Sequence, residues 1–312
     1  MNEIRVNTIY ASDCLDGLKK IKDDYVQCCV TSPPYWKLRN YGMPQQLGLE
    51  VSPETYIDSL VEIFAEVKRV LRPDGTLWLN MGDVYWGSGK VGNNPHLQTN
   101  HKEFGKPDKN VSRHGLPTTG RHPEIKAKDL VGLPWMLAFA LRKQGWYLRQ
   151  DIIWHKPNPM PESVTDRCTR AHEYIFLLSK NKKYYFDSDA IKTEALGKTG
   201  HNLVSRPARK ALDEPLVNCF RKEPGPYLFA NRRSVWQLTN KPFASAHFAT
   251  FPIELPERCI MAGSREGDIV LDPFMGAGTT ALAASRLKRN FIGFELNPDY
   301  VEIAVDRLRK DN

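Results

Sequence analysis

Two short stretches of the sequence combine residue types that could do chemistry at the end of a strand. In the first, TSPPYW at residues 31–36, a hydroxyl, two prolines and two aromatic side chains follow the apolar run 26–30. Pro33 and Pro34 remove two backbone donors and fix two φ angles, so the strand must end there. The stretch therefore holds Ser32 and Tyr35 on a stiff turn, although a plain turn with packing aromatics explains it equally well when taken alone.

The second stretch, IVLDPFMGAGTT at residues 269–280, reads as a strand, a glycine loop and the start of a helix. Gly276 and Gly278 would let a ligand approach the backbone and would expose the first amides of the helix. Glu295 closes the following strand, 19 residues after Gly276, about where an acid would hydrogen-bond ribose hydroxyls. The pattern therefore predicts a nucleoside cofactor.

Three nucleoside cofactors compete for this loop. A phosphate loop for ATP or GTP needs Gly-Lys-Ser/Thr, whereas Gly278 is followed by two threonines. A dinucleotide loop would read GxGxxG, and here Ala281, which is tolerated, stands at the third glycine position. S-adenosylmethionine has no pyrophosphate and brings a zwitterionic amino acid, which suits a short Gly-x-Gly loop flanked by Asp272. The loop favours this third cofactor and leaves the dinucleotide open.

The elements around both stretches alternate between strands and helices. Apolar periodicity and capping residues predict helices over 52–75 and 128–146, and strands over 76–80, 147–156 and 173–179. Such alternation is typical of a doubly wound, mostly parallel α/β sheet. Ligands on these sheets bind at the carboxyl ends of the strands, so one crevice is expected to hold both stretches.

The composition fits an ordinary soluble globular protein. Of the 312 residues, 41% are apolar and 26% charged, and no stretch approaches the ~20 apolar residues that span a bilayer. The N-terminus has no apolar signal core. The six cysteines show neither a CxxC pair nor a regular spacing, which predicts reduced thiols in a cytoplasmic protein. The histidine spacings between residues 96 and 122 match no ligand pattern, so no metal is predicted.

The net charge of +8 is concentrated in two stretches. Residues 88–128 and 195–235 each hold eight Lys and Arg against three acids, which makes each +5 and leaves −2 for the rest of the chain. Charge runs are usually solvated loops. Clustering of this kind nevertheless predicts a contact surface for a polyanion, more firmly for 195–235 because aromatic residues lie between its basic ones.

Together the motifs resemble the amino-group DNA methyltransferases of bacteria, archaea and phages. That family carries the catalytic tetrapeptide Ser/Asp/Asn-Pro-Pro-aromatic, and its β class has the circularly permuted order, in which this motif precedes the cofactor loop. The resemblance covers nearly the whole chain and includes GTLWLNMGD, KDLVGLPWMLAFALR, DIIWHKPNPMPES, HEYIFLLSK and HFATFP. It implies a Rossmann-like sheet of seven strands, doubly wound and mostly parallel, with the two basic segments inserted.

The resemblance also implies a cofactor, a substrate and site residues. The methyl donor would be S-adenosylmethionine, and the acceptor a base flipped out of double-stranded DNA. The catalytic residues would be Ser32, Pro33, Pro34 and Tyr35. The cofactor would contact Asp13, Thr31, Phe251, Asp272, Phe274, Gly276, Gly278, Thr279 and Glu295. Of these, Glu295 would bind the ribose and Asp13 would lie near the adenine ring, although a plain turn residue also explains Asp13.

The chemistry of the amine accounts for the tetrapeptide. An exocyclic amine is a poor nucleophile because its lone pair is delocalised into the ring. The Ser32 side chain and the Pro33 carbonyl would accept the amine hydrogens and draw the lone pair out, while Tyr35 would stack on the base. Transfer would then be direct, without metal or covalent intermediate. In this family Ser at the first position favours cytosine N4, and adenine N6 is the alternative.

The expected domains follow the family order. Residues 1–190 form a catalytic half with the basic insertion at about 88–128, residues 191–240 a target-recognition segment, and residues 241–312 a cofactor-binding half. The DNA contacts are expected from Arg206, Arg209, Lys210, Arg221, Lys222, Arg232 and Arg233. A cognate restriction endonuclease is an expected companion, though not as a stable subunit.

Two alternatives come from other classes of protein. A dinucleotide-dependent oxidoreductase would use the same glycine loop but has no need of Ser-Pro-Pro-Tyr at a strand end. A nucleic-acid-binding protein with a vestigial cofactor fold would need neither motif intact. An RNA substrate is compatible with the motifs, although their order is typical of enzymes that act on DNA.

Overall fold

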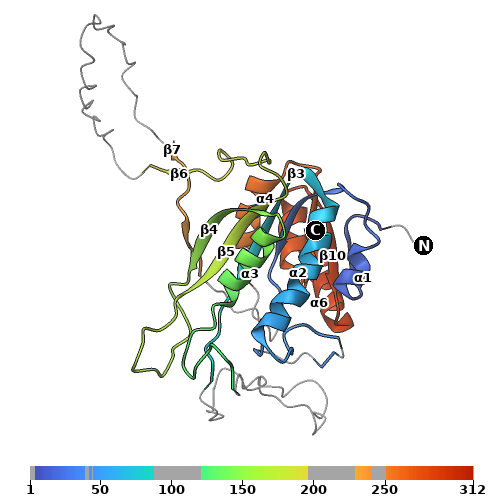
Figure 1. The fold of residues 1–312 in the computed structure, drawn as a ribbon. Coiled ribbons are helices and arrows are strands. Elements are labelled where there is room, and N and C mark those ends of the chain that lie inside the picture. The colour runs from blue at the N-terminus through green and yellow to red at the C-terminus, as the bar shows by residue number, and fades with distance from the viewer. Residues whose placement is uncertain are drawn as a thin grey trace, which may run out of the picture. The chain divides into compact units, whose positions relative to one another are not determined.

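The computed structural model describes residues 4–38, 42–43, 45–87, 121–195, 229–239 and 251–311. The chain divides into two compact units, one of residues 1–187 and 234–312 and the other of residues 188–233. The larger unit is built on an eight-stranded sheet (Figure 1). Its strands are β1 (Thr8–Ala11), β2 (Val26–Thr31), β3 (Leu71–Met81), β4 (Tyr147–His155), β5 (His172–Ser179), β8 (Val235–Gln237), β9 (Ile269–Asp272) and β10 (Asn290–Glu295).

The sheet has the strand order β1-β10-β9-β2-β3-β5-β4-β8. Only β5 runs antiparallel to its neighbours, β3 and β4, while every other pair is parallel. The predicted doubly wound, mostly parallel α/β class is confirmed. The predicted number of seven strands is wrong, because β8 adds an eighth strand along β4, pairing Val235 with Ile153. A strand of three residues beside an irregular, basic stretch carries no periodicity that sequence reading could detect.

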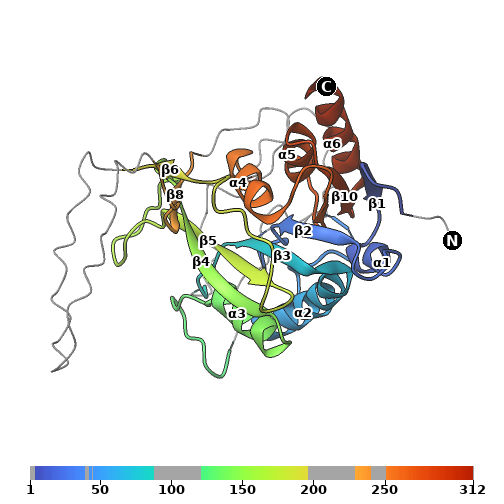
Figure 2. The ribbon, with the colours of Figure 1, turned by 90° about the horizontal axis from the view of Figure 1, so that it is seen from above.

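Helices cover both faces of the sheet. Figure 2 shows α1 (Cys14–Leu18), α2 (Pro53–Val70) and α3 (Leu133–Lys143) on one face, and α4 (Glu254–Gly263), α5 (Thr279–Arg286) and α6 (Pro298–Asp311) on the other. In α2, the Ser52 side chain accepts a hydrogen bond from the Thr55 amide at 3.2 Å, as the capping pattern predicts. The helix ends at Val70, before the predicted stop at Pro73, because Leu71 already pairs with Val26 in the sheet.

The strand β2 lies in the interior of the sheet. All six of its residues are buried, as expected for a parallel strand with helices on both faces. It pairs in parallel with β9, matching Cys28 with Val270 and Cys29 with Leu271. The carboxyl ends of β2 and β9 therefore lie side by side, and the two motifs of the sequence meet at one edge of the sheet.

The smaller unit, residues 188–233, contains a two-stranded antiparallel sheet. Its strands β6 (Thr193–Glu194) and β7 (Phe229–Ala230) pair Thr193 with Ala230 and Glu194 with Phe229. The Arg232 guanidinium donates a hydrogen bond to the Ile191 carbonyl at 2.8 Å. The role of this segment in target recognition stays a prediction.

Candidate active site

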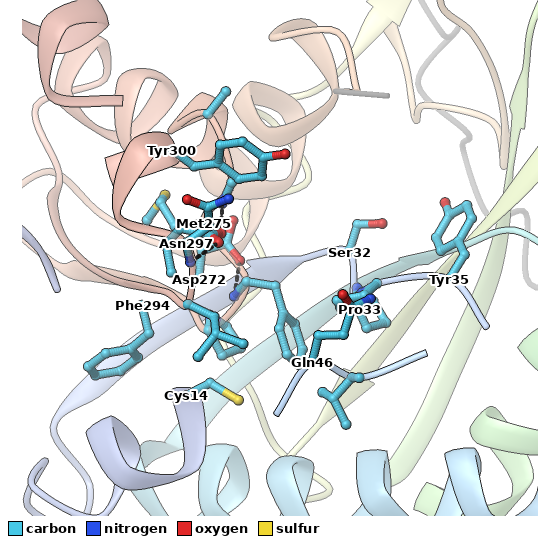
Figure 3. A pocket seen from close by; sticks show the side chains of 18 of the residues that line it. Cys14, Ser32, Pro33, Tyr35, Gln46, Asp272, Met275, Phe294, Asn297 and Tyr300 are labelled. Atoms are coloured by element: carbon cyan, nitrogen blue, oxygen red, sulfur yellow. Dashed lines mark hydrogen bonds between the residues drawn. The ribbon is translucent and has the colours of Figure 1, made fainter. Parts of the chain in front are cut away.

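One pocket at the carboxyl ends of β2, β9 and β10 is lined by residues of both motifs. Figure 3 shows Ser32, Pro33 and Tyr35 on one side of it and Asp272, Met275 and Tyr300 on the other. The predicted residues that line the pocket are Asp13, Ser32, Pro33, Pro34, Tyr35, Phe251, Asp272, Phe274, Gly276, Thr279 and Glu295. Two predicted cofactor residues, Thr31 and Gly278, do not line it.

Thr31, a predicted cofactor residue, lies outside the pocket lining and bonds to Asp272. Its side chain is fully buried, and its hydroxyl donates to Asp272 Oδ1 at 2.6 Å. Asp272 Oδ1 also accepts from the Phe274 amide at 3.0 Å, and Oδ2 accepts from the Thr280 hydroxyl at 2.7 Å. These bonds join the carboxyl end of β2 to the cofactor loop at residues 272–280. Thr31 therefore holds the two motifs together through Asp272.

Asp272 is expected to make stability depend on pH. Burial raises its pKa from the usual 3.8 to about 6. Its carboxyl stays protonated in the folded protein while it ionises in the unfolded chain, so stability falls as pH rises from about 4 to about 6, by about 3 kcal/mol. In Asp272→Asn the amide can donate to the Thr280 hydroxyl, which then donates to the Val30 carbonyl 3.3 Å away.

The test compares the unfolding free energies of the wild type and Asp272→Asn in urea across this pH range. The wild-type value should fall relative to that of the variant as pH rises, because asparagine does not titrate. A difference between the two proteins that stays constant with pH would contradict the shifted pKa.

The two glycines of the cofactor loop serve different purposes. Gly276 has φ +52°, and a Cβ built there would meet only the Phe274 carbonyl oxygen, at 4.0 Å. Its amide donates to Glu295 Oε2 at 2.8 Å. Gly278 has φ +78°, and a Cβ there would lie 2.7 Å from the Cβ of Ala304 in α6. Gly276 thus keeps space open on the pocket side, whereas Gly278 allows α5 and α6 to pack closely.

Glu295 and Asp13, two of the acids that line the pocket, are each fixed by two backbone amides. Glu295 accepts from the Gly276 amide and, through Oε1, from the Asn297 amide at 2.9 Å, and burial raises its pKa. Asp13 caps α1 by accepting from the Leu15 and Asp16 amides at 2.8 and 3.1 Å. Each carboxylate is therefore held in one orientation at the pocket wall, where its remaining lone pairs can accept ligand hydroxyls or amines.

Sequence reasoning missed several residues that line the pocket. Besides the predicted Phe251 and Phe274, the additional lining residues include Cys14, Gln46, Met275, Phe294, Asn297 and Tyr300. Tyr300 follows the Asn297–Pro298 helix start, a pattern that placed the helix but gave no sign of which side chain faces the pocket. Burial raises the pKa of the Cys14 thiol to about 12, and Asp13 adds to the effect, so this thiol stays protonated.

Of the two proline carbonyls of the tetrapeptide, only that of Pro34 has a hydrogen-bond donor among the described residues. The Pro34 carbonyl accepts a hydrogen bond from the Tyr56 hydroxyl at 2.8 Å. Among the described residues, none donates to the Pro33 carbonyl. The neighbouring Trp36 is fully buried and donates to the Glu50 carbonyl at 3.0 Å, which anchors the turn to the core. The Ser32 hydroxyl and the Pro33 carbonyl are therefore the acceptors that this turn offers to a ligand.

The Tyr35 hydroxyl is held by polar side chains of β3 and β5. It donates to Glu173 Oε2 at 2.7 Å and lies 3.4 Å from Asn80 Oδ1. Burial raises the pKa of Tyr35 well above its usual range, the Glu173 carboxylate raises it further, and a hydrogen bond with the Ser32 side chain opposes them. Tyr35 is therefore a neutral phenol with a fixed ring beside Ser32.

Most of the predicted DNA-contact residues lie outside the described residues, namely Arg206, Arg209, Lys210, Arg221 and Lys222. The remaining two, Arg232 and Arg233, belong to the smaller unit. Burial lowers the pKa of Arg232. The contact of these residues with DNA stays a prediction.

No helix in the described ranges is long and apolar enough to cross a membrane. Within the same ranges, no group of three or more His, Cys, Asp or Glu side chains could hold a metal ion.

Comparison with known proteins identifies the family. A sequence model named N6_N4_Mtase and described as DNA methylase matches residues 26–306. The chain belongs to this family. The type II methyltransferase M.Cfr9I of Citrobacter freundii is 44% identical over 99% of this chain and 90% of its own length. M.SmaI of Serratia marcescens is 42% identical, over 98% of this chain and 92% of its own.

Solved structures share the fold of this DNA methyltransferase. The PvuII DNA methyltransferase, described as cytosine-N4-specific, aligns at 19% identity with a TM-score of 0.64 and covers 98% of this chain and 87% of its own. TTHA0409 of Thermus thermophilus, solved in complex with S-adenosyl-L-methionine, aligns at 24% identity with a TM-score of 0.60 and covers 97% and 93%. At these identities the likeness concerns the fold alone.

As a member of the amino-group DNA methyltransferases, the chain uses S-adenosylmethionine as its cofactor. The pocket fits this molecule. It has an open backbone at Gly276, two anchored acids for hydroxyls or an amine, and apolar walls from Phe274 and Phe294. No lysine follows Gly278 to bind phosphates. Family membership also decides against the dinucleotide-dependent oxidoreductase.

Proposed function

We propose that this DNA methyltransferase is site-specific and methylates the exocyclic N4 amine of cytosine flipped out of duplex DNA. The observation that supports cytosine is the Ser32 hydroxyl, which stands where an adenine-N6 enzyme of this family would typically carry Asp or Asn. Ser32 lines the pocket beside the Pro33 carbonyl, so the amine would meet two neutral acceptors. Adenine N6 is the alternative acceptor for the same site.

The residues of the tetrapeptide act on the base. The Ser32 hydroxyl and the Pro33 carbonyl accept hydrogen bonds from the two amine hydrogens and orient the nitrogen lone pair out of the ring plane. After methyl transfer the nitrogen is cationic and releases one of these protons to water. The Tyr35 ring, fixed by Glu173, stacks on the extruded base. When bound, S-adenosylmethionine supplies a methyl group on a positively charged sulfur. Positioning accounts for most of the rate, and the reaction needs no covalent intermediate.

The opposite wall of the pocket holds the cofactor. Glu295 accepts the ribose hydroxyls, Asp13 lies near the adenine ring, and Phe251 and Phe274 line the apolar part. Asp272 acts mainly through its bonds to Thr31 and Thr280, because its side chain is only 2% exposed.

Product analysis tests the choice of base. The protein and S-adenosylmethionine are incubated with DNA from a strain without methyltransferases, and the digested nucleosides are analysed by mass spectrometry. N4-methylcytosine is the expected product, and mapping the modified positions then gives the recognition sequence. N6-methyladenine would overturn the proposal for cytosine while leaving the pocket and cofactor in place.

The basic segment 195–235 is expected to bind DNA phosphates. Neutralising Arg206, Arg209 and Lys210 together should lower the salt dependence of DNA binding. The slope of log K against log salt should fall by up to about 0.9 for each phosphate that the variant no longer neutralises. The measurement is DNA affinity by fluorescence anisotropy over a series of salt concentrations. A slope equal to that of the wild type would remove these three residues from the interface.

A matched control neutralises three lysines at the opposite edge of the sheet. Lys143, Lys182 and Lys183 are exposed, the first at the end of α3 and the other two after the end of β5, away from the pocket. The control variant should keep the wild-type slope. We also propose that the protein is cytoplasmic and that it acts beside a cognate restriction endonuclease, a role in line with the type II methyltransferase names of its relatives.

A further inference from the structure

A polar cluster lines the pocket on the side of Ser32 and Tyr35, and the proposed function uses it only through the bond between Glu173 and Tyr35. It consists of Asn80, Lys156 and Glu173, joined to Tyr35. Asn80 lies near the end of β3, Lys156 directly follows β4, and Glu173 is the second residue of β5. Because β5 is antiparallel to β3 and β4, it begins at the edge where they end, and Trp154 pairs with Glu173. The cluster therefore lies at the same edge as Ser32.

Glu173 is fixed through both carboxylate oxygens. Oε2 accepts from the Tyr35 hydroxyl at 2.7 Å and from Asn80 Nδ2 at 3.2 Å. Oε1 forms an ion pair with Lys156, and the side chains of Glu173 and Lys156 are only 14% and 18% exposed. The carboxylate has little capacity left for a ligand, so its role is to position Lys156.

Lys156 retains donor capacity. Its ammonium lies 4.3 Å from the centroid of the Trp154 ring, and Trp154 is itself fixed by a hydrogen bond from Nε1 to the Leu238 carbonyl at 3.0 Å. Among the described residues, Glu173 and the Trp154 ring are the partners of this ammonium. An ammonium has three N–H donors, so at least one is available to a ligand in the pocket.

We propose that Lys156 is a specificity-determining residue that donates a hydrogen bond to the ring edge of the extruded base, with Glu173 as its positioning residue. The proposal rests on the proposed cytosine-N4 function. Next to its amine, cytosine presents two acceptors, N3 and O2, whereas adenine presents N1 followed by a C–H. A cationic donor beside the amine site would therefore stabilise cytosine more than adenine. Lys156 is linked through Glu173 to Tyr35, which places it with the base-binding residues.

The test measures the affinity of the full chain for three duplexes in the presence of S-adenosylhomocysteine. The duplexes carry the mapped recognition site with cytosine, adenine or an abasic sugar at the target position. The proteins are the wild type, Lys156→Met, Glu173→Gln and the control Lys310→Met, which removes an exposed lysine of α6 outside the pocket. Circular dichroism checks that each variant is folded.

Lys156→Met should weaken binding of the cytosine duplex by about tenfold or more, as expected when a hydrogen bond to a base is removed. The adenine and abasic duplexes should change by less than about threefold. Glu173→Gln should lower the ratio of cytosine-duplex to adenine-duplex affinity in the same direction by a smaller factor, a change that a merely structural role would not produce. Lys310→Met should leave this ratio unchanged.

Two outcomes would overturn the proposal about Lys156 and leave the proposed function intact. Equal weakening of all three duplexes would make Lys156 a phosphate-binding residue, and unchanged affinities would remove it from the DNA complex. Failure of the proposed function is a separate observation, because it appears as N6-methyladenine in the product of the wild type. In that case the inference about Lys156 falls with it.

Discussion

Replacing Tyr35 by alanine is expected to lower kcat by about 100-fold, while the dissociation constant for S-adenosylmethionine stays within about twofold of the wild type. Stacking of a base on an aromatic ring contributes about 1–3 kcal/mol, and each 1.4 kcal/mol is a factor of about ten in rate. The variant also leaves Glu173 without the 2.7 Å hydrogen bond from the tyrosine hydroxyl. Methyl-transfer kinetics and calorimetric titration of the cofactor measure the two quantities.

The control variant Tyr35→Phe separates the ring from the hydroxyl. Phenylalanine keeps the stacking face and loses only the bond to Glu173, so kcat should fall by about tenfold or less. If Tyr35→Ala retained wild-type kcat, the stacking role would be excluded. If Tyr35→Phe lost as much activity as Tyr35→Ala, the hydroxyl rather than the ring would be the important group.

Gly278→Ala is expected to destabilise the protein by about 3 kcal/mol. An alanine at φ +78° is strained by about 1–2 kcal/mol, and its Cβ would lie 2.7 Å from the Cβ of Ala304, so α5 and α6 would have to separate. The melting temperature should fall by several degrees. Differential scanning calorimetry without ligand measures the change.

Gly276→Ala provides the matched comparison within the same loop. Its φ of +52° also carries some strain, but no side chain lies within 4 Å of the added methyl group, which would project toward the pocket. We expect a loss of only about 1 kcal/mol in stability together with a rise of about tenfold or more in the dissociation constant for S-adenosylmethionine. The reverse pattern, with Gly278→Ala impairing binding alone and Gly276→Ala unfolding the protein, would contradict the division of roles between the two glycines.

Local patterns in the sequence predicted the elements that carry the motifs. Ser52 and Pro53 begin a helix, the run from Val26 continues as a strand, and Asn297 precedes the last helix. Each of these features depends on neighbours in the chain, such as a cap, a proline or a buried strand. The rule that ligands bind at the carboxyl ends of parallel strands then predicts one crevice for both motifs, and the parallel pairing of β2 with β9 places them at one edge of the sheet.

The contacts that the sequence does not reveal join distant segments of the chain. Thr31 bonds to Asp272, 241 residues away, and Tyr35 bonds to Glu173, 138 residues away. The antiparallel direction of β5 brings Glu173 to the edge where the other strands end, and no periodicity in the sequence encodes that direction. The Gly-x-Gly motif assigns Gly278 to the cofactor loop and gives no sign of its packing partner, Ala304, which lies in a different helix.

Methyl transfer to cytosine N4 in the pocket between Ser32 and Gly276 can be followed with an isotope label. The wild type and Tyr35→Ala are each incubated with unmethylated DNA and S-adenosylmethionine that carries a deuterated methyl group. The digested nucleosides are then separated and identified by mass spectrometry. We expect deuterated N4-methylcytosine from the wild type and only a small fraction of that amount from the variant. Label on adenine N6, or equal yields from the two proteins, would contradict this expectation.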